Sequence, residues 1–259
     1  MEKGSGGMKT KLITAIMITL FLAGMVAIVI PVKADSGRFA GMTYEYRVAT
    51  PDEVAALPHI IDATGKDIAI LVEGSGLTIE GLIIHDAEQF GIAVDAQSDV
   101  KVTGCEIYNI GYHSSDGSFD PNGCQYGNAI YFYGSSGEIS YNTVGNYQKG
   151  GIIANLPSPD GEPVNILYNT VRGLGPVTFI AQNGIQMGWG AKGTIRGNTV
   201  SGNYYISYEV PGEGKAIGQQ AWVSCGILLY LVEPGENGVK PSQNKIQDNQ
   251  VPIYVYPVH

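Results

Sequence analysis

A few charged residues stand near short hydrophobic segments and could carry out chemistry on a sugar chain. Lys149 and Arg172 could supply the base and the positive charge of a polysaccharide lyase, which removes a proton beside a neutralised carboxylate. The remaining catalytic candidates are Asp95, Asp116 and Asp120. No cofactor follows with certainty, but these aspartates could hold calcium, or Asp95 could pair with one of the others as in a glycoside hydrolase. Turn capping and solubility also explain such residues.

Aromatic and amide side chains form a second group of candidates. These side chains lie on, or directly after, predicted strands that begin with a small residue followed by isoleucine, such as Gly151-Ile152 and Gly184-Ile185. We call these segments Gly-Ile strands. Side chains of a strand alternate between its faces, so the isoleucines predict an inward face and their neighbours an outward one. The outward residues that we expect to bind substrate are Tyr131, Tyr133, Gln186, Trp189 and Tyr230. Rings pack on apolar sugar faces and amides bond hydroxyls, although tyrosine is also common on ordinary sheets.

The elements that would position these side chains repeat one pattern. Its clearest copies are Ile139-Ser140-Tyr141-Asn142-Thr143-Val144, Ile166-Leu167-Tyr168-Asn169-Thr170-Val171 and Ile195-Arg196-Gly197-Asn198-Thr199-Val200. Written in register, the rows share a column of Leu82, Cys105, Asn142, Asn169, Asn198 and Asn244. A column four residues later holds residues that tolerate tight turns, namely Asp86, Asn109, Asn146, Gly173, Gly202 and Asp248. His85 and His113 stand in equivalent loops of consecutive rows.

Stacked coils explain both columns. When coils lie about 4.8 Å apart, like residues stack in line, and an inward asparagine can bond the backbone and the asparagines above and below it. An antiparallel β-sandwich also has short strands and many turns, but it does not predict a shared asparagine column. The sequence therefore predicts an all-β solenoid, a parallel β-helix of about six or more three-strand coils.

These rows resemble those of the pectate-lyase-like right-handed parallel β-helix superfamily, over roughly residues 65 to 259. The resemblance implies a right-handed coil with a groove beside the Gly-Ile strands. The superfamily contains polysaccharide lyases, glycoside hydrolases, uronan epimerases and noncatalytic surface proteins. The sequence lacks the polygalacturonase series Asn-Thr-Asp, Asp-Asp, Gly-His-Gly and Arg-Ile-Lys, and also the epimerase motif Asp-Pro-His-Asp, so no catalytic residue is carried over. Two classes stay open: noncatalytic polysaccharide binding, and a lyase or hydrolase acting on an acidic polysaccharide.

The first 34 residues differ from the rest of the chain. Lys9 and Lys11 precede an apolar run over residues 12–32, and Val32-Lys33-Ala34 offers small residues where signal peptidase cuts. Residues 1–34 are therefore predicted to be a signal peptide or an uncleaved membrane anchor of a secreted or cell-surface protein. Residues 35–64 are predicted to be a lead-in and cap, and 65–259 the β-helix with long loops at 108–127 and 201–226. The net charge of −9 argues against a nucleic-acid partner.

Overall fold

The computed structural model describes residues 37–113, 119, 126–178, 180–206, 223–235 and 238–256. Residues Asp35–His259 form one compact unit. Residues 1–34, much of the predicted loops 108–127 and 201–226, and both Asp116 and Asp120 lie outside the described residues. Within the described part, no helix is long and apolar enough to cross a membrane.

Three parallel sheets hold the strands of the described part. Sheet A contains β1 (Tyr44–Val48), β3 (Ile68–Val72), β6 (Phe90–Asp95), β9 (Asn128–Tyr133), β12 (Gly150–Asn155), β15 (Asn183–Gly188), β18 (Cys225–Tyr230) and β21 (Val251–Tyr256). Sheet B contains β2 (Ile60–Asp62), β5 (Ile83–His85), β8 (Glu106–Ile110), β11 (Thr143–Tyr147), β14 (Thr170–Val177), β17 (Thr199–Tyr205) and β20 (Lys245–Gln247). Sheet C contains β4 (Thr78–Glu80), β7 (Val100–Thr103), β10 (Gly137–Ser140), β13 (Val164–Leu167), β16 (Gly193–Arg196) and β19 (Val239–Ser242).

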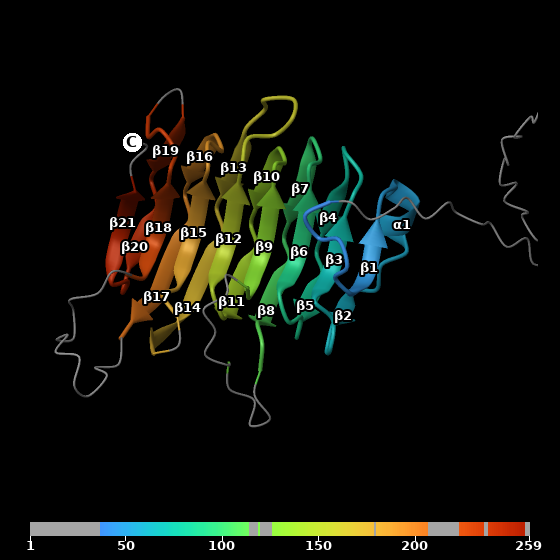
Figure 1. Ribbon diagram of the computed structural model, residues 1–259, viewed down its shortest axis with the longest axis horizontal. Coiled ribbons are helices and arrows are strands. Elements are labelled where there is room, and N and C mark those ends of the chain that lie inside the picture. The colour runs from blue at the N-terminus through green and yellow to red at the C-terminus, as the bar shows by residue number, and fades with distance from the viewer. Residues whose placement is uncertain are drawn as a thin grey trace, which may run out of the picture. The chain divides into compact units, whose positions relative to one another are not determined.

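From β4 onward, each coil takes one strand from every sheet. The chain runs through β4 in sheet C, β5 in sheet B and β6 in sheet A, and β7 then begins the next coil. Neighbours within a sheet therefore come from successive coils, and they pair in parallel, as β9 does with β12. Figure 1 shows the coils following one another along the long axis of the molecule. The predicted parallel β-helix is confirmed. Parallel pairing begins before residue 65, because β1 pairs with β3 and β2 with β5.

An asparagine ladder lines the turn from sheet C to sheet B. Asn142 donates from Nδ2 to Oδ1 of Asn169 over 2.9 Å, and Asn169 donates in the same way to Asn198 over 3.0 Å. Asn198 continues the ladder to Asn244, also over 3.0 Å. Asn142, Asn169 and Asn198 are at most 1% exposed. Cys105 occupies the same column and donates its backbone N–H to Oδ1 of Asn142. The ladder thus satisfies the polar backbone of an inward-facing turn.

The second sequence column lies where strands of sheet B end. A left-handed backbone, with φ between 48° and 75°, occurs at Asp86, Asn109, Asn146, Gly202 and Asp248. Gly173 is the exception to the prediction. In that coil β14 continues past Gly173 with a register shift between Arg172 and Gly175, and Gly175 takes a φ of 84° instead. Two residues of β14 therefore stand opposite one residue of β17, and the strand takes up the one extra residue.

Aliphatic columns fill the interior of the coil. One column in sheet A is fully buried and consists of Ile70, Ile92, Ile130, Ile152, Ile185 and Ile227. Helix α1 (Pro51–Ala55) lies at the N-terminal end of the stack (Figure 1). Thr50 and Glu53 form a capping box at its start, and Val54 and Leu57 pack against the core.

Candidate functional site

The outer face of sheet A carries the predicted binding residues. Two outward columns run across its strands, one with Leu71, Ala93, Tyr131, Ile153, Gln186, Leu228 and Tyr254, the other with Asp95, Tyr133, Asn155, Gly188, Tyr230 and Tyr256. The intervening side chains, such as Ile130 and Phe132, are fully buried in the core. The alternation expected for the Gly-Ile strands is therefore present.

The N-terminal part of this face is covered. Phe39 is 1% exposed, and its ring lies 6.1 Å from that of Tyr131 and 6.5 Å from that of Tyr133. It also packs edge-on against Phe90, with the ring centroids 5.3 Å apart. Tyr131 is left only 7% exposed, and burial raises the pKa of its hydroxyl. The expectation of an open strip at Tyr131 is therefore wrong, because residues upstream of the first strand occupy that place.

The charged side chain of Arg38 belongs to the same covering segment. Its guanidinium carbon lies 5.7 Å from the centre of the Tyr133 ring, within cation–π range. Gly37 lies against the carboxylate of Asp95, so close that a Cβ there would overlap it. Asp95 is thus part of the contact with the N-terminal segment rather than of an open groove, and its predicted partners Asp116 and Asp120 are outside the described residues.

A row of amides continues along the middle of the face. Asn183 donates from Nδ2 to Oε1 of Gln186 over 3.1 Å, and Gln186 donates from Nε2 to Oδ1 of Asn155 over 3.0 Å. Asn155 in turn donates to the hydroxyl of Tyr131 over 3.2 Å. Gln186 is 8% exposed. The amide that we expected to bind substrate hydroxyls is therefore engaged within the protein, where it fixes the neighbouring side chains.

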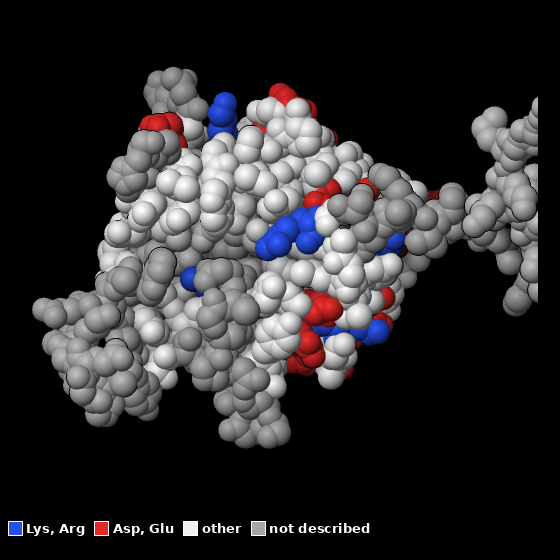
Figure 2. Space-filling model, in the orientation of Figure 1, with Lys and Arg blue, Asp and Glu red and all other residues white. Residues whose placement is uncertain are grey.

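Four aromatic residues of the described part remain accessible beyond this row. One is Tyr254, and the other three contact one another and are called the aromatic platform: Trp189, Tyr230 and Tyr256. Tyr230 and Tyr256 stack with centroids 4.8 Å apart, and Trp189 lies 4.9 Å from Tyr230 at a tilt of 56°. Trp189 is 46% exposed. Tyr256 is 38% exposed and Tyr230 is half-buried, so the indole is the most exposed ring of the platform. Figure 2 shows few charged side chains over β15 and β18, whereas such residues gather over the N-terminal strands.

Lys149 stands directly before β12, at the start of the same face. Its Nζ donates to the carbonyl of Ala181 over 2.6 Å. Although part of the side chain reaches solvent, desolvation of the ammonium lowers the pKa of Lys149 to about 8, partly offset by interaction with Cys225. Burial raises the pKa of the Cys225 thiol to about 12. A lysine that is partly neutral near pH 8 has the properties of a general base.

Arg172 does not join Lys149 in one site on the sheet A face. It is an exposed residue in β14 of sheet B, where it pairs in register with Gly145 and Ser201. Its side chain therefore belongs to the outer face of a different sheet. In the preceding coil the register partner of Arg172 is Gly145, not Lys149, so Lys149 and Arg172 do not occupy equivalent positions.

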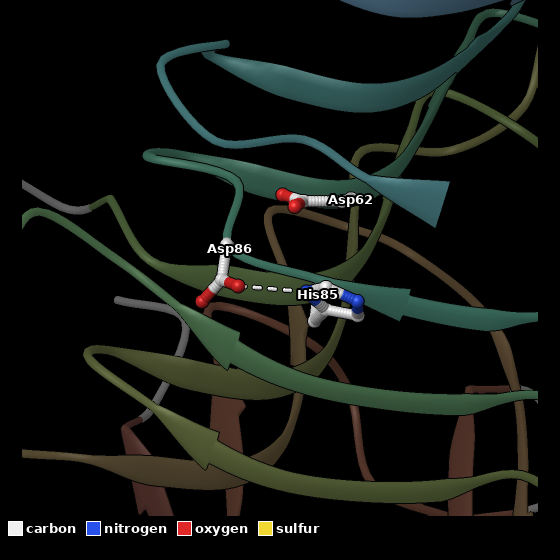
Figure 3. A group of neighbouring side chains, drawn as sticks. All are labelled: Asp62, His85 and Asp86. Carbon is white, nitrogen blue, oxygen red and sulfur yellow. Dashed lines mark hydrogen bonds and ion pairs between the residues drawn. The ribbon is translucent and has the colours of Figure 1, made fainter. Parts of the chain in front are cut away.

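Sequence reasoning missed a cluster on the outer face of sheet B. Asp62 and His85 end the paired strands β2 and β5, and Asp86 follows at the turn. One ligand atom from each of the three lies within 4.8 Å of the other two (Figure 3). Nδ1 of His85 is 2.7 Å from Oδ2 of Asp86, and the His85 ring stacks on Tyr108 at 5.3 Å. The feature of the sequence that could have pointed to this cluster is the histidine that recurs in equivalent loops of consecutive rows, as His85 and His113.

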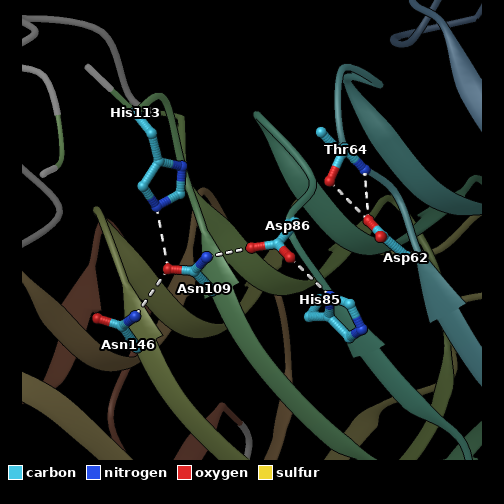
Figure 4. A network of polar contacts seen from close by, with 7 residues as sticks. All are labelled: Asp62, Thr64, His85, Asp86, Asn109, His113 and Asn146. Carbon is cyan, nitrogen blue, oxygen red and sulfur yellow. Dashed lines mark hydrogen bonds and ion pairs between the residues drawn. The ribbon is translucent and has the colours of Figure 1, made fainter. Parts of the chain in front are cut away.

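A polar network extends from this cluster along the turn column (Figure 4). Asn109 donates from Nδ2 to Oδ1 of Asp86, and Asn146 donates to Oδ1 of Asn109 over 2.8 Å. Nε2 of His113 also lies 3.0 Å from Oδ1 of Asn109. His113 thus contacts the network at Asn109, one coil beyond His85 and two coils beyond Asp62. The turn residues form an outer ladder that fixes one oxygen of Asp86.

Comparison with known proteins agrees with this architecture. Residues 59–257 match the family described as the right-handed beta helix region, so the chain belongs to that family. No curated protein and no solved structure matches the chain. The family defines the fold and the handedness of the coil. The function depends on which side chains the surface of the coil presents.

Proposed function

We propose that this protein binds a polysaccharide on the outer face of sheet A, at the aromatic platform of Trp189, Tyr230 and Tyr256. The observation that carries the proposal is the 46% exposed indole of Trp189, in the turn directly after β15, beside Tyr230 at the end of β18. Large aromatic rings contribute apolar area and a polar edge, which suits the mixed surface of a sugar. Binding, without catalysis, is the function that this surface supports best.

The charge of the face supports a neutral sugar chain over an acidic one. Few basic residues lie over β15 and β18 in Figure 2, and the chain as a whole carries a net charge of −9. An acidic polysaccharide would meet repulsion there, with few cations to offset it. Because Phe39 covers the N-terminal strands, the bound segment would lie over the C-terminal coils.

The same proposal includes export of the chain. Lys9 and Lys11 before the apolar run of residues 12–32, and the small residues that end at Ala34, support a secretory signal. Mass spectrometry of the exported protein should find an N-terminus at Asp35. Recovery of the intact chain from the membrane fraction would instead support an anchor.

The test is affinity electrophoresis against a panel of neutral and acidic polysaccharides. A Trp189→Ala, Tyr230→Ala double variant should bind roughly thirtyfold more weakly, since each of the two ring contacts contributes about 1 kcal/mol. The matched control is Tyr141→Ala, Tyr168→Ala, which removes a second pair of exposed stacked rings, 5.3 Å apart, from the turn between sheets C and B. Equal retardation of the parent and both variants would contradict the proposal.

A polysaccharide lyase acting on an acidic polysaccharide is the second candidate, and Lys149 is the observation that favours it. With its pKa lowered to about 8 by desolvation, Lys149 could take the proton next to a sugar carboxylate while the glycosidic oxygen leaves. Ultraviolet absorbance of unsaturated products, measured with and without calcium, tests this reaction. A lyase should lose turnover by orders of magnitude in Lys149→Ala and keep much of its binding. Absence of unsaturated product from every polysaccharide would exclude it.

A further inference from the structure

We propose that Asp62, His85 and Asp86 bind one divalent transition-metal cation, such as Zn²⁺ or Mn²⁺, on the outer face of sheet B. The site is separate from the sugar-binding proposal, which concerns sheet A. One ligand atom from each residue lies within 4.8 Å of the others, so small side-chain rotations can bring all three onto one ion (Figure 3). Water would complete the coordination.

The donor set decides the class of metal. An imidazole nitrogen with two carboxylate oxygens suits zinc or manganese, whereas calcium and magnesium prefer oxygen ligands alone. The Nδ1 atom of His85 and Oδ2 of Asp86 already lie 2.7 Å apart, at hydrogen-bond distance. The cation would bind both atoms in place of this hydrogen bond, with any proton on Nδ1 released to solvent.

The backbone holds the three donors in place before any ion binds. Asp62 and His85 are register partners in parallel strands, and the N–H of Ala63 donates to the carbonyl of His85 over 2.9 Å. Side chains of register partners in adjacent parallel strands point to the same face of the sheet and lie about 4.8 Å apart. Asp86 has a left-handed backbone with φ of 64°, at the point where the chain leaves β5. The site is thus built on sheet geometry and does not depend on a long loop.

Each carboxylate has one oxygen fixed by a neighbour, which leaves the other for a ligand. Thr64 donates from its N–H and its hydroxyl to Oδ1 of Asp62, over 3.0 and 2.6 Å. Asn109 donates to Oδ1 of Asp86, whose Oδ2 faces His85 (Figure 4). Hydrogen bonds from neighbouring residues to metal ligands orient the ligands and strengthen the binding of the metal.

The local charge also favours a cation. Within the described part of the chain, neither Asp62 nor Asp86 forms an ion pair with lysine or arginine, and the one charged contact is that of Asp86 with His85. The two carboxylates therefore carry negative charge that no lysine or arginine of the described residues neutralises. Tyr108 stacks on the His85 ring and restricts its rotation.

The experiment is isothermal titration of the untagged protein with Zn²⁺, Mn²⁺ and Ca²⁺, together with thermal melting in each metal. We expect one Zn²⁺ or Mn²⁺ per chain, a raised melting temperature, and weaker binding of Ca²⁺. His85→Ala and the conservative variant Asp62→Asn should each bind the transition metal roughly tenfold more weakly or worse. His59→Ala is the control, because His59 is an exposed histidine just before β2, outside the cluster.

The outcomes separate a metal site from a structural role. If His85→Ala unfolds, Asp62→Asn still reports on binding, because Asp62 is exposed at the end of a short strand. Equal affinity of the parent and Asp62→Asn would overturn the proposal, as would the absence of saturable binding of Zn²⁺ and Mn²⁺ by the parent. Loss of binding in His59→Ala as well would point to non-specific histidine binding and would also overturn it.

Discussion

Replacement of Asn169 by leucine should destabilise the fold at the centre of the asparagine ladder. The side chain of Asn169 accepts from the N–H and Nδ2 of Asn142, both over 2.9 Å, and donates to Ile139 over 2.9 Å and to Asn198 over 3.0 Å. In the variant, the buried N–H of Asn142 loses its partner and the carbonyl of Ile139 loses its amide donor. Nδ2 of Asn142 keeps the carbonyl of Val102.

Each buried polar group left without a partner costs about 1–3 kcal/mol, so Asn169→Leu should lower the free energy of unfolding by about 2–5 kcal/mol. For a domain of this size that corresponds to a fall in melting temperature of about 5–15 °C. Thermal melting followed by circular dichroism measures it. The control is Asn165→Leu, the same substitution at a half-buried position of β13 in the same coil. Equal melting of the two variants would refute the ladder argument.

Three further predictions concern buried side chains. Phe39→Ala should lower the free energy of unfolding by about 3–5 kcal/mol in denaturant melts, whereas Tyr141→Ala, at a 64% exposed residue, should change it by under about 0.5 kcal/mol. The pKa of Lys149 falls from 10.5 to about 8 on folding, so the unfolded state binds more protons between these values and the parent gains stability as pH rises through them. Lys149→Met should therefore be more stable than the parent at neutral pH, by a margin that shrinks above about pH 8; a constant margin would contradict the burial argument. Cys105 and Cys225, whose thiols have raised pKa values through burial, should resist alkylation in the folded chain and react once it unfolds, as peptide mass spectrometry can measure.

The repeating part of the fold could be predicted from the sequence because stacking makes like residues recur. Asn142, Asn169 and Asn198 occupy equivalent turns, and each bonds the next, so the chemistry of one row requires the same residue in its neighbours. Gly173 deviates because β14 takes up one extra residue through a register shift, and no feature of a single row encodes such a shift.

The covered part of the candidate site could not be predicted, because its contacts join residues outside the repeat. Phe39 packs on Tyr131 from a segment with no periodic pattern, and together with Phe90 it leaves Tyr131 buried and not open. Gln186 was expected to face a sugar, but its amide bonds Asn155 from the preceding coil. Asp62 precedes the first row recognised in the sequence, so its register with His85 became visible only through the pairing of β2 with β5.

The location of sugar binding is tested most directly by hydroxyl-radical footprinting with mass spectrometry, using the polysaccharide that binds most tightly in the panel. The method measures the oxidation of all exposed aromatic side chains in one experiment, so the rings outside the proposed binding site serve as an internal control. Oxidation of Trp189 and Tyr230 should slow in the presence of the polysaccharide, and that of the exposed residues Tyr141 and Tyr168 should not change. Unchanged oxidation of Trp189, or equal protection of Tyr141 and Tyr168, would contradict binding on the outer face of sheet A.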